Sequence, residues 1–343
     1  MKILRTLDDL ARAGLIDGQE RARLAPVAQH YAIGVTATMA GLMVPGAADD
    51  PLARQFLPDS RELVQVPQEL QDPIGDDAHS PVKGVVHRHA DRVLLKMLLT
   101  CPVYCRFCFR RESVGQAAGA LNAAELDAAL GYIAGHPEIW EVILTGGDPL
   151  MLSARRLADV LTRLAAMAHV KVVRLHSRVP VVAPGLITPA MVTALRRKDV
   201  AVYIAIHANH PRELGAEAQR AVAALADAGV PLVSQSVLLR GVNDDVDVLA
   251  ALMRRFVELR IKPYYLHHPD LAPGTGHFRL PVAEGQSLMA ALRRRISGLA
   301  MPVYVLDIPG GYGKVVLTPG AVTESAEDLM VRDASGRQHP YSS

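Results

Sequence analysis

From about residue 86 onward, short apolar runs alternate with longer stretches in which apolar residues recur at helical spacing. The short runs are rich in residues that favour strands and predict strands at 92–99, 141–145, 171–176, 200–206, 231–238 and 261–267. The stretches between them, such as SARRLADVLTRLAAMA, predict amphipathic helices. Six strand–helix units in a row predict an α/β fold with a parallel sheet and helices outside it. Because six units are visible rather than eight, we expect a partial (β/α)6 TIM-like barrel with its active site at the C-terminal ends of the strands.

The chain on either side of this region has a different pattern. Residues 1–85 are rich in Ala, Leu, Pro and Asp, and the prolines limit helix length, so we expect a helical and irregular arm there. Residues 86–300 would form the barrel. In residues 301–343, MPVYVLDIPGGYGKVVLTPG predicts a strand, a Gly-rich turn and a second strand, and ESAEDLMVRDASGRQHPYSS predicts a hairpin with a polar tail.

Composition narrows the class of protein. Half of the residues are hydrophobic and the net charge is +2, so bulk charge gives no reason to expect binding to nucleic acid or to an anionic membrane. No apolar run reaches the roughly 18 residues that a membrane span requires. Asp8 and Asp9 interrupt the apolar N-terminal patch, so we expect no secretory signal. We therefore expect a cytoplasmic protein in a reducing compartment.

All three cysteines fall within eight residues, as Cys101, Cys105 and Cys108, directly after the first predicted strand. Thiolates are soft ligands that suit zinc or iron–sulfur clusters. A structural zinc site needs four ligands, usually in two separated pairs, and the sequence has no second pair. Three thiolates would instead hold a [4Fe–4S] cluster and leave one iron open to the amino and carboxylate groups of a cofactor. The alternative is three inert thiols, because cysteine is among the most buried residue types.

A glycine-rich turn follows the second predicted strand, in the stretch TGGDP. Gly146 and Gly147 would let the backbone approach a ligand closely, with Asp148 beside them. Alone, this stretch predicts a tight turn and no more. Together with the C-x3-C-x2-C spacing it resembles the radical S-adenosylmethionine enzymes, in which such a turn holds the amino group of S-adenosylmethionine.

A second glycine-rich turn, in DIPGGYGK, ends in Lys314. It fails the P-loop pattern, because no Ser or Thr follows the lysine. A lysine at a strand edge beyond a tight turn can form a Schiff base with pyridoxal phosphate. The alternative, a solvated surface lysine after a hairpin turn, is favoured by these residues on their own.

From about residue 50 onward, the chain resembles the lysine 2,3-aminomutase family of radical S-adenosylmethionine enzymes, including the branch that supplies β-lysine to elongation factor P. The resemblance is carried by DPIGDDAHSPVKGVVHRHADRVLL, CPVYCRFCFRR, TGGDPL, HSRVPVV, HANHP, SQSVLLRGVND, PYYLHHPDLAPGTGHFRLPV and DIPGGYGK. It implies an isomerase that converts L-lysine to β-lysine by migration of the amino group from C2 to C3. It also implies a [4Fe–4S] cluster, S-adenosylmethionine and pyridoxal 5′-phosphate as cofactors, with flavodoxin or ferredoxin as the electron donor.

The resemblance assigns cofactor-binding roles to five residues. It implies that Lys314 carries pyridoxal phosphate and that Arg88 and Arg178 hold its phosphate, for which arginine is well suited. It places Gln235 and His207 in contact with S-adenosylmethionine. An isolated arginine is more commonly part of an ordinary salt bridge.

The resemblance also assigns the substrate contacts. It implies that Arg110 binds the substrate carboxylate and that Asp270 and Asp307 bind the ε-ammonium group of lysine. A remote cation needs buried carboxylates, and a pocket built to pair that charge rejects neutral or acidic side chains. The alternatives are a turn cap for Asp270 and a pairing with a nearby arginine for Asp307.

The chain also departs from the family. Longer members have extra C-terminal cysteines that bind zinc at a subunit interface, and this chain has none to spare, so we expect any homo-oligomer to lack that zinc. The short form resembles the elongation factor P branch, whereas the intact DIPGGYGK ending is not typical of it. An aminomutase for glutamate, arginine or ornithine and a non-catalytic metal-binding barrel remain as alternatives.

Overall fold

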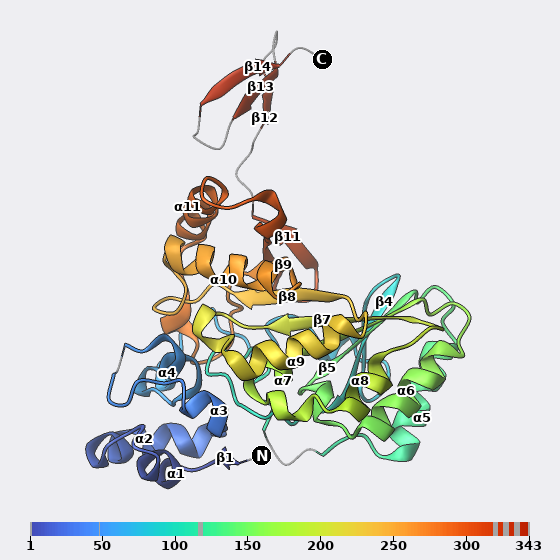
Figure 1. Cartoon of the computed structure of the whole chain (residues 1–343), viewed down its shortest axis with the longest axis horizontal. Coiled ribbons are helices and arrows are strands. Elements are labelled where there is room, and N and C mark those ends of the chain that lie inside the picture. Colours follow the sequence, from blue (N-terminus) through green and yellow to red (C-terminus); the bar gives the residue numbers. More distant parts are fainter. Residues whose placement is uncertain are drawn as a thin grey trace.

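The computed structural model describes residues 2–47, 49–115, 119–317, 322–324, 329–332 and 337–341. A nine-stranded sheet is its central feature, with the order β11-β10-β9-β8-β7-β6-β5-β4-β3 (Figure 1). The strands are β3 (Val85–His89), β4 (Arg92–Leu98), β5 (Glu141–Gly146), β6 (Val172–Ser177), β7 (Ala201–His207), β8 (Leu232–Val237), β9 (Lys262–His267), β10 (Val303–Ile308) and β11 (Gly313–Val316).

The strands from β4 to β10 are parallel, and the edge strands β3 and β11 pair antiparallel to their neighbours. The six strands expected from the sequence are β4 to β9, so the prediction of a partial TIM-like barrel is confirmed. The two edges approach each other through the Gly-rich turn. A Cβ on Gly311 would lie 3.3 Å from Cδ of Arg88 in β3, and a Cβ on Gly313 would lie 3.4 Å from Cε1 of His89. The barrel is therefore nearly closed.

The sheet is larger than the expected six strands. The segment Val303–Ile308 was expected only as part of a C-terminal strand–turn–strand, yet it pairs parallel to β9 as a seventh parallel strand. Helix α11 (Val282–Arg293) makes the crossover between them. The barrel sheet thus runs to Val316, past the expected end at residue 300.

The outer helices bury one face each against the sheet. In α6, the buried residues Leu157, Val160, Leu161 and Leu164 recur at the spacing of one helix face. Thr188 caps α8 and Pro189 occupies its first turn. These helices are α5 (Ala123–Ala134), α6 (Ala154–Ala165), α7 (Val179–Val182), α8 (Pro189–Leu195), α9 (Ala216–Asp227) and α10 (Val246–Glu258).

The N-terminal arm is built from short elements, coloured blue in Figure 1. Side chains such as Leu10, Val27 and Phe56 are fully buried, so the arm packs as part of the fold. Glu62 is also fully buried and forms ion pairs with Arg106 and Arg111 of the cysteine-containing loop. The arm comprises β1 (Ile3–Leu4), α1 (Leu7–Arg12), α2 (Gly18–His30), β2 (Val35–Thr36), α3 (Ala37–Ala40) and α4 (Pro51–Phe56).

The C-terminal segment forms a small antiparallel sheet of β12 (Val322–Glu324), β13 (Leu329–Arg332) and β14 (Gln338–Tyr341). The pairing of β13 with β14 confirms the expected hairpin, whereas its connection and the end of the polar tail lie outside the described residues. Across the described ranges, no helix combines the length and apolar character needed to cross a bilayer.

Candidate active site

The three cysteines lie on the loop that follows β4, at the C-terminal end of the barrel strands. Burial, followed by the nearby charges of other acidic groups, raises the pKa of the Cys101 thiol well above its ordinary range. Burial and the neighbouring Cys105 raise the pKa of Cys108 to about 11. All three cysteine residues are half-buried. Thiols this hard to ionise release their protons when a metal group binds them.

The TGGDP turn packs its backbone against the start of the cysteine loop. The amide of Gly147 donates to the carbonyl of Leu98 at 2.6 Å, and that of Asp148 donates to the carbonyl of Thr100 at 3.0 Å. Gly146 has a φ of +102°, and a Cβ on Gly147 would collide with the backbone of Thr100. Only glycine suits these two positions, and they bring the turn beside the cysteines.

Asp148 connects the loops that follow β5 and β6. Its carboxylate accepts hydrogen bonds from the Ser177 hydroxyl at 2.7 Å and from the amides of Arg178 and Val179 at 2.7 and 3.0 Å. Both carboxylate oxygens are therefore engaged within the chain. The side chain of Asp148 thus holds these two loops together.

Three histidines with buried Nε2 atoms line the interior beside these loops: His176 on β6, His207 on β7 and His267 on β9. Burial lowers the pKa of each, so the rings are neutral near pH 7. In the described part of the chain, the Nε2 atom of each ring has no hydrogen-bond partner. Buried polar atoms normally have partners, so these atoms mark places where the polar groups of a bound cofactor or substrate fit.

The two residues expected to contact S-adenosylmethionine lie side by side. The parallel register of β7 and β8 pairs His207 with Gln235. The His207 ring also lies 5.7 Å from the ring of Phe107, next to Cys108. This placement brings both residues to the same end of the barrel as the cysteine loop.

A buried cluster of cations surrounds Asp76. Arg110 of the cysteine loop pairs with its Oδ2 at 2.8 Å, Lys96 of β4 lies 3.6 Å from it, and Arg88 of β3 lies 3.8 Å from Oδ1. Burial alone would raise the pKa of Asp76, but these cations outweigh it and hold the pKa below its ordinary value. Three cations against one carboxylate leave an excess of positive charge, which suits an anionic group. Asp76 has no distinguishing signal of its own in the sequence, although it lies in one of the stretches that carry the resemblance.

A cluster of acids lies on the other side, on β10 and after β9. Asp307 pairs directly with Lys314 across the β10–β11 register, with Nζ 2.5 Å from Oδ1, and its Oδ2 lies 3.4 Å from Nδ1 of His267. Burial would raise the pKa of Asp307, but His267 and Lys314 hold it well below its ordinary value. Burial and then the charge of Asp307 raise the pKa of Asp270 to about 7.

The two clusters face one interior. The charges of Arg110 and Arg88 both act on the Asp270 carboxyl, and the charges of Lys314 and Arg110 both act on His176. The interior thus has an excess of cations toward the cysteine loop and β3, and two carboxyl groups beside one lysine toward β9 and β10. Such a site suits an elongated molecule with an anionic group at one end and a cationic group at the other.

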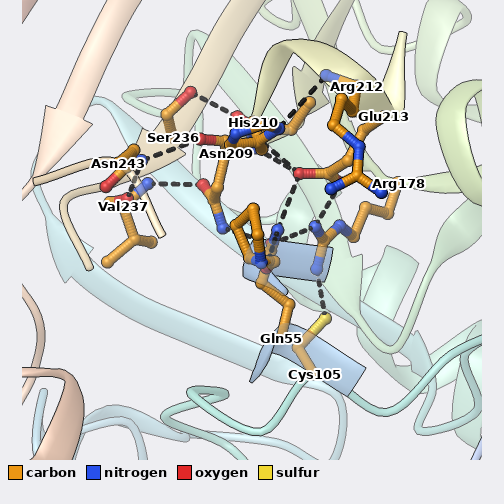
Figure 2. Close-up of polar contacts among 12 residues, drawn as sticks. Gln55, Cys105, Arg178, Asn209, His210, Arg212, Glu213, Ser236, Val237 and Asn243 are labelled. Carbon is orange, nitrogen blue, oxygen red and sulfur yellow. Dashed lines mark hydrogen bonds and ion pairs between the residues drawn. The ribbon is translucent and has the colours of Figure 1, made fainter. Parts of the chain in front are cut away.

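The two arginines expected to share a phosphate contact different groups. Arg88 donates to the carbonyl of Ile74 and lies against Gly311 in the turn that carries Lys314. Arg178 contacts Cys105 and the buried side chains Gln55 and Glu213 (Figure 2). Only Arg88 lies beside the Gly-rich turn.

Two comparisons with known proteins agree with this geometry. Residues 95–253 match the model of the radical SAM superfamily. It is 38% identical to L-lysine 2,3-aminomutase of Clostridium subterminale over 99% of this chain and 82% of that protein. It is 42% identical to L-lysine 2,3-aminomutase of Acetoanaerobium sticklandii over 84% of this chain and 70% of that protein. The chain belongs to the lysine 2,3-aminomutase family.

The similarity of one solved structure is too low to support this assignment further. A radical SAM methyltransferase from Sphaerobacter thermophilus is similar at a TM-score of 0.47 and 18% identity, covering 65% of this chain and 68% of that chain. The family itself implies a [4Fe–4S] cluster, S-adenosylmethionine and pyridoxal phosphate as cofactors. The cysteine loop, the unpaired histidine nitrogens and the cation cluster fit these groups.

Proposed function

We propose that the chain is a pyridoxal phosphate-dependent L-lysine 2,3-aminomutase that converts L-lysine to β-lysine. The observation that carries this proposal is the pair of neighbouring carboxyl groups, Asp270 and Asp307, of which Asp307 pairs with Lys314 at 2.5 Å. Two neighbouring acids need a cation between them, because an unpaired charge that is shielded from water is costly. Lys314 supplies that cation in the ligand-free chain. Once Lys314 is bound to a cofactor, the side-chain ammonium of lysine takes its place.

The rest of the site orients the other end of the substrate. Arg110 binds the α-carboxylate, and its double contact with Asp76 holds the guanidinium in place. Asp270 and Asp307 read the distal ammonium, so a glutamate side chain would meet two like charges and be rejected. Ornithine and arginine carry a distal cation at other distances and are the closer rivals.

The other residues of the site hold the cofactors. Lys314 and Arg88 hold pyridoxal phosphate, and Cys101, Cys105 and Cys108 hold the cluster. The TGGDP backbone, His207 and Gln235 hold S-adenosylmethionine. When bound, these groups supply radical generation and stabilisation of the migrating amino group, and the chain orients them and excludes water.

The test is an anaerobic assay of the reconstituted enzyme. Lysine, S-adenosylmethionine, pyridoxal phosphate and dithionite are supplied, and the amino acid products are separated and identified. We expect β-lysine, dependent on both organic cofactors. Turnover of glutamate, ornithine or arginine in preference to lysine would contradict the substrate assignment. Uncoupled cleavage of S-adenosylmethionine with no rearranged amino acid would contradict the aminomutase assignment.

Two further roles rest on the resemblance alone. We infer that flavodoxin or ferredoxin donates the electron. If so, one of these proteins should be able to replace dithionite in the assay. We also infer that elongation factor P receives the β-lysine. Intact-mass analysis of that factor, from cells with and without this chain, should show loss of a β-lysyl group in the deletion strain.

A further inference from the structure

Arg178 lies where β6 ends, and its side chain reaches the cysteine loop. Nη1 donates to Sγ of Cys105 at 2.8 Å. Nη2 donates to Oε1 of Gln55 at 2.8 Å and to Oε2 of Glu213 at 2.6 Å. The whole residue is only 5% exposed. A buried cation is thus aimed at one of the three sulfurs expected to bind the cluster (Figure 2).

Glu213 pairs this cation and fixes where it points. It is fully buried, and its Oε1 accepts from Nε2 of Gln55 at 3.0 Å and from the amides of Asn209 and His210 at 2.8 and 2.9 Å. Both oxygens are therefore satisfied, which is the condition under which a buried ion pair is tolerated. The network leaves Arg178 little freedom to move away from Cys105.

The N-terminal arm contributes directly to this network. Gln55 in α4 is fully buried, and besides Arg178 and Glu213 it contacts Nδ2 of Asn209 at 3.1 Å. Its backbone carbonyl accepts from the amide of Arg106 in the cysteine loop at 2.8 Å. The next residue, Phe56, places its ring 4.7 Å from the Arg178 guanidinium carbon. One turn of the arm thus touches both the cysteine loop and the arginine that contacts it.

We propose that Arg178 is a positioning residue for the iron–sulfur cluster, which holds Cys105 by hydrogen bonding and raises the reduction potential of the cluster, and that Gln55 of the arm sets its position. The reduced cluster carries more negative charge than the oxidised one. A donor on a ligating sulfur therefore stabilises the reduced form more, and hydrogen bonds to the sulfurs are among the factors that set such potentials. This role replaces the phosphate contact that the resemblance implies for Arg178.

A purely structural ion pair is the competing explanation. If Arg178 served only to neutralise Glu213, a variant that keeps both charges but removes the contact of Gln55 with the arginine would leave the potential of the cluster unchanged. The reduction potential therefore separates the two explanations. It is measured without lysine or pyridoxal phosphate, so the result is independent of the proposed function.

The experiment uses the full chain reconstituted anaerobically with iron and sulfide. Wild type is compared with Arg178→Gln, Gln55→Met and the control Arg163→Gln, which removes an exposed arginine paired with Asp127 on the outer surface. Iron and sulfide per chain are measured first, and the potential is then determined by titration followed by electron paramagnetic resonance. We expect a more negative potential for Arg178→Gln, a smaller shift in the same direction for Gln55→Met, and none for the control.

A wild-type potential in cluster-loaded Arg178→Gln would overturn the proposal. If that variant takes up no cluster, Gln55→Met decides, because it keeps both buried charges of the network. A lowered potential in Gln55→Met supports the proposal, and a wild-type potential there overturns it.

Discussion

Nζ of Lys314 lies 2.5 Å from Oδ1 of Asp307, the residue directly opposite it in the antiparallel β10–β11 pair. One lysine thus serves two purposes. In the ligand-free chain it balances the acids of the site, and in the proposed enzyme it anchors pyridoxal phosphate. Cofactor binding would then free Asp307 for the substrate ammonium, so the site for the substrate charge is completed only after the cofactor is in place.

Replacement of Lys314 with alanine tests the anchoring role. We expect Lys314→Ala to lose the visible absorbance of bound pyridoxal phosphate and its fixation by borohydride, because no other amine is placed to replace it in the Gly-rich turn. Iron and sulfide content should be unchanged. Lys83→Ala, which removes an exposed lysine paired with Glu125, is the matched control and should keep the cofactor spectrum. An unaltered spectrum in Lys314→Ala would assign the cofactor to another lysine.

Replacement of Asp76 with asparagine tests the cation cluster. The change leaves Arg88, Lys96 and Arg110 without their shared carboxylate, and breaking a buried ion pair in this way costs about 3–5 kcal/mol. We expect a lower thermal midpoint and a higher KM for lysine, because Arg110 loses its anchor. Asp127→Asn on the surface should change neither. A fall in thermal midpoint with an unchanged KM would mean that Asp76 supports the fold without orienting Arg110.

Asp270 makes the stability of the cofactor-free chain depend on pH. Its pKa is about 7 in the folded chain and near 3.8 when unfolded, so between these values the folded state holds a proton that the unfolded state has released. Stability therefore falls as the pH rises from about 4 to about 7. We expect Asp270→Asn to raise the thermal midpoint of the cofactor-free protein, and to raise it more at pH 8 than at pH 5. An equal effect at both pH values would show that Asp270 is ionised throughout.

The elements that the sequence predicts well are those with a strong local pattern. The six strands β4 to β9 follow from the sequence because each is a short run of residues that favour strands and lacks the helical spacing of the stretches between them. The β9–α11–β10 unit was missed because Gly285 weakens the helical pattern of α11. The structure explains this glycine, since a Cβ there would collide with the hydroxyl of Tyr304 in β10.

The site residues likewise differ in how far the sequence alone predicts them. Asp307 and Lys314 lie on one short hairpin, and the single motif DIPGGYGK contains both. Gln55 and Glu213 are 158 residues apart and belong to no motif, yet they meet in one buried hydrogen bond of 3.0 Å. The three cations that pair with Asp76 likewise come from separate segments, which are β3, β4 and the cysteine loop. Single polar residues in an irregular arm give no periodic signal, so only the tertiary structure identifies them.

Substrate choice is tested most sharply by the two acids that face the proposed ammonium group. Asp270→Asn or Asp307→Asn would leave a buried cation half-paired, which costs roughly 2–5 kcal/mol, or about 30-fold to several-thousand-fold in kcat/KM. A solvent-exposed pair would cost less than about 1 kcal/mol. Each variant is assayed with lysine, with its iron content as the control for folding and cluster assembly.

The decisive comparison is between lysine and norleucine, which has nearly the same shape but lacks the distal ammonium group. Wild type should prefer lysine strongly, because norleucine leaves both carboxylates without a cation. Removing either carboxylate should reduce kcat/KM for lysine far more than for norleucine, because the lost interaction exists only with the charged substrate. An equal loss for both substrates would mean that the aspartates support the site without reading the charge. A loss of less than about fivefold for lysine, with the cluster intact, would place the ammonium elsewhere, since a desolvated pair is worth more than that.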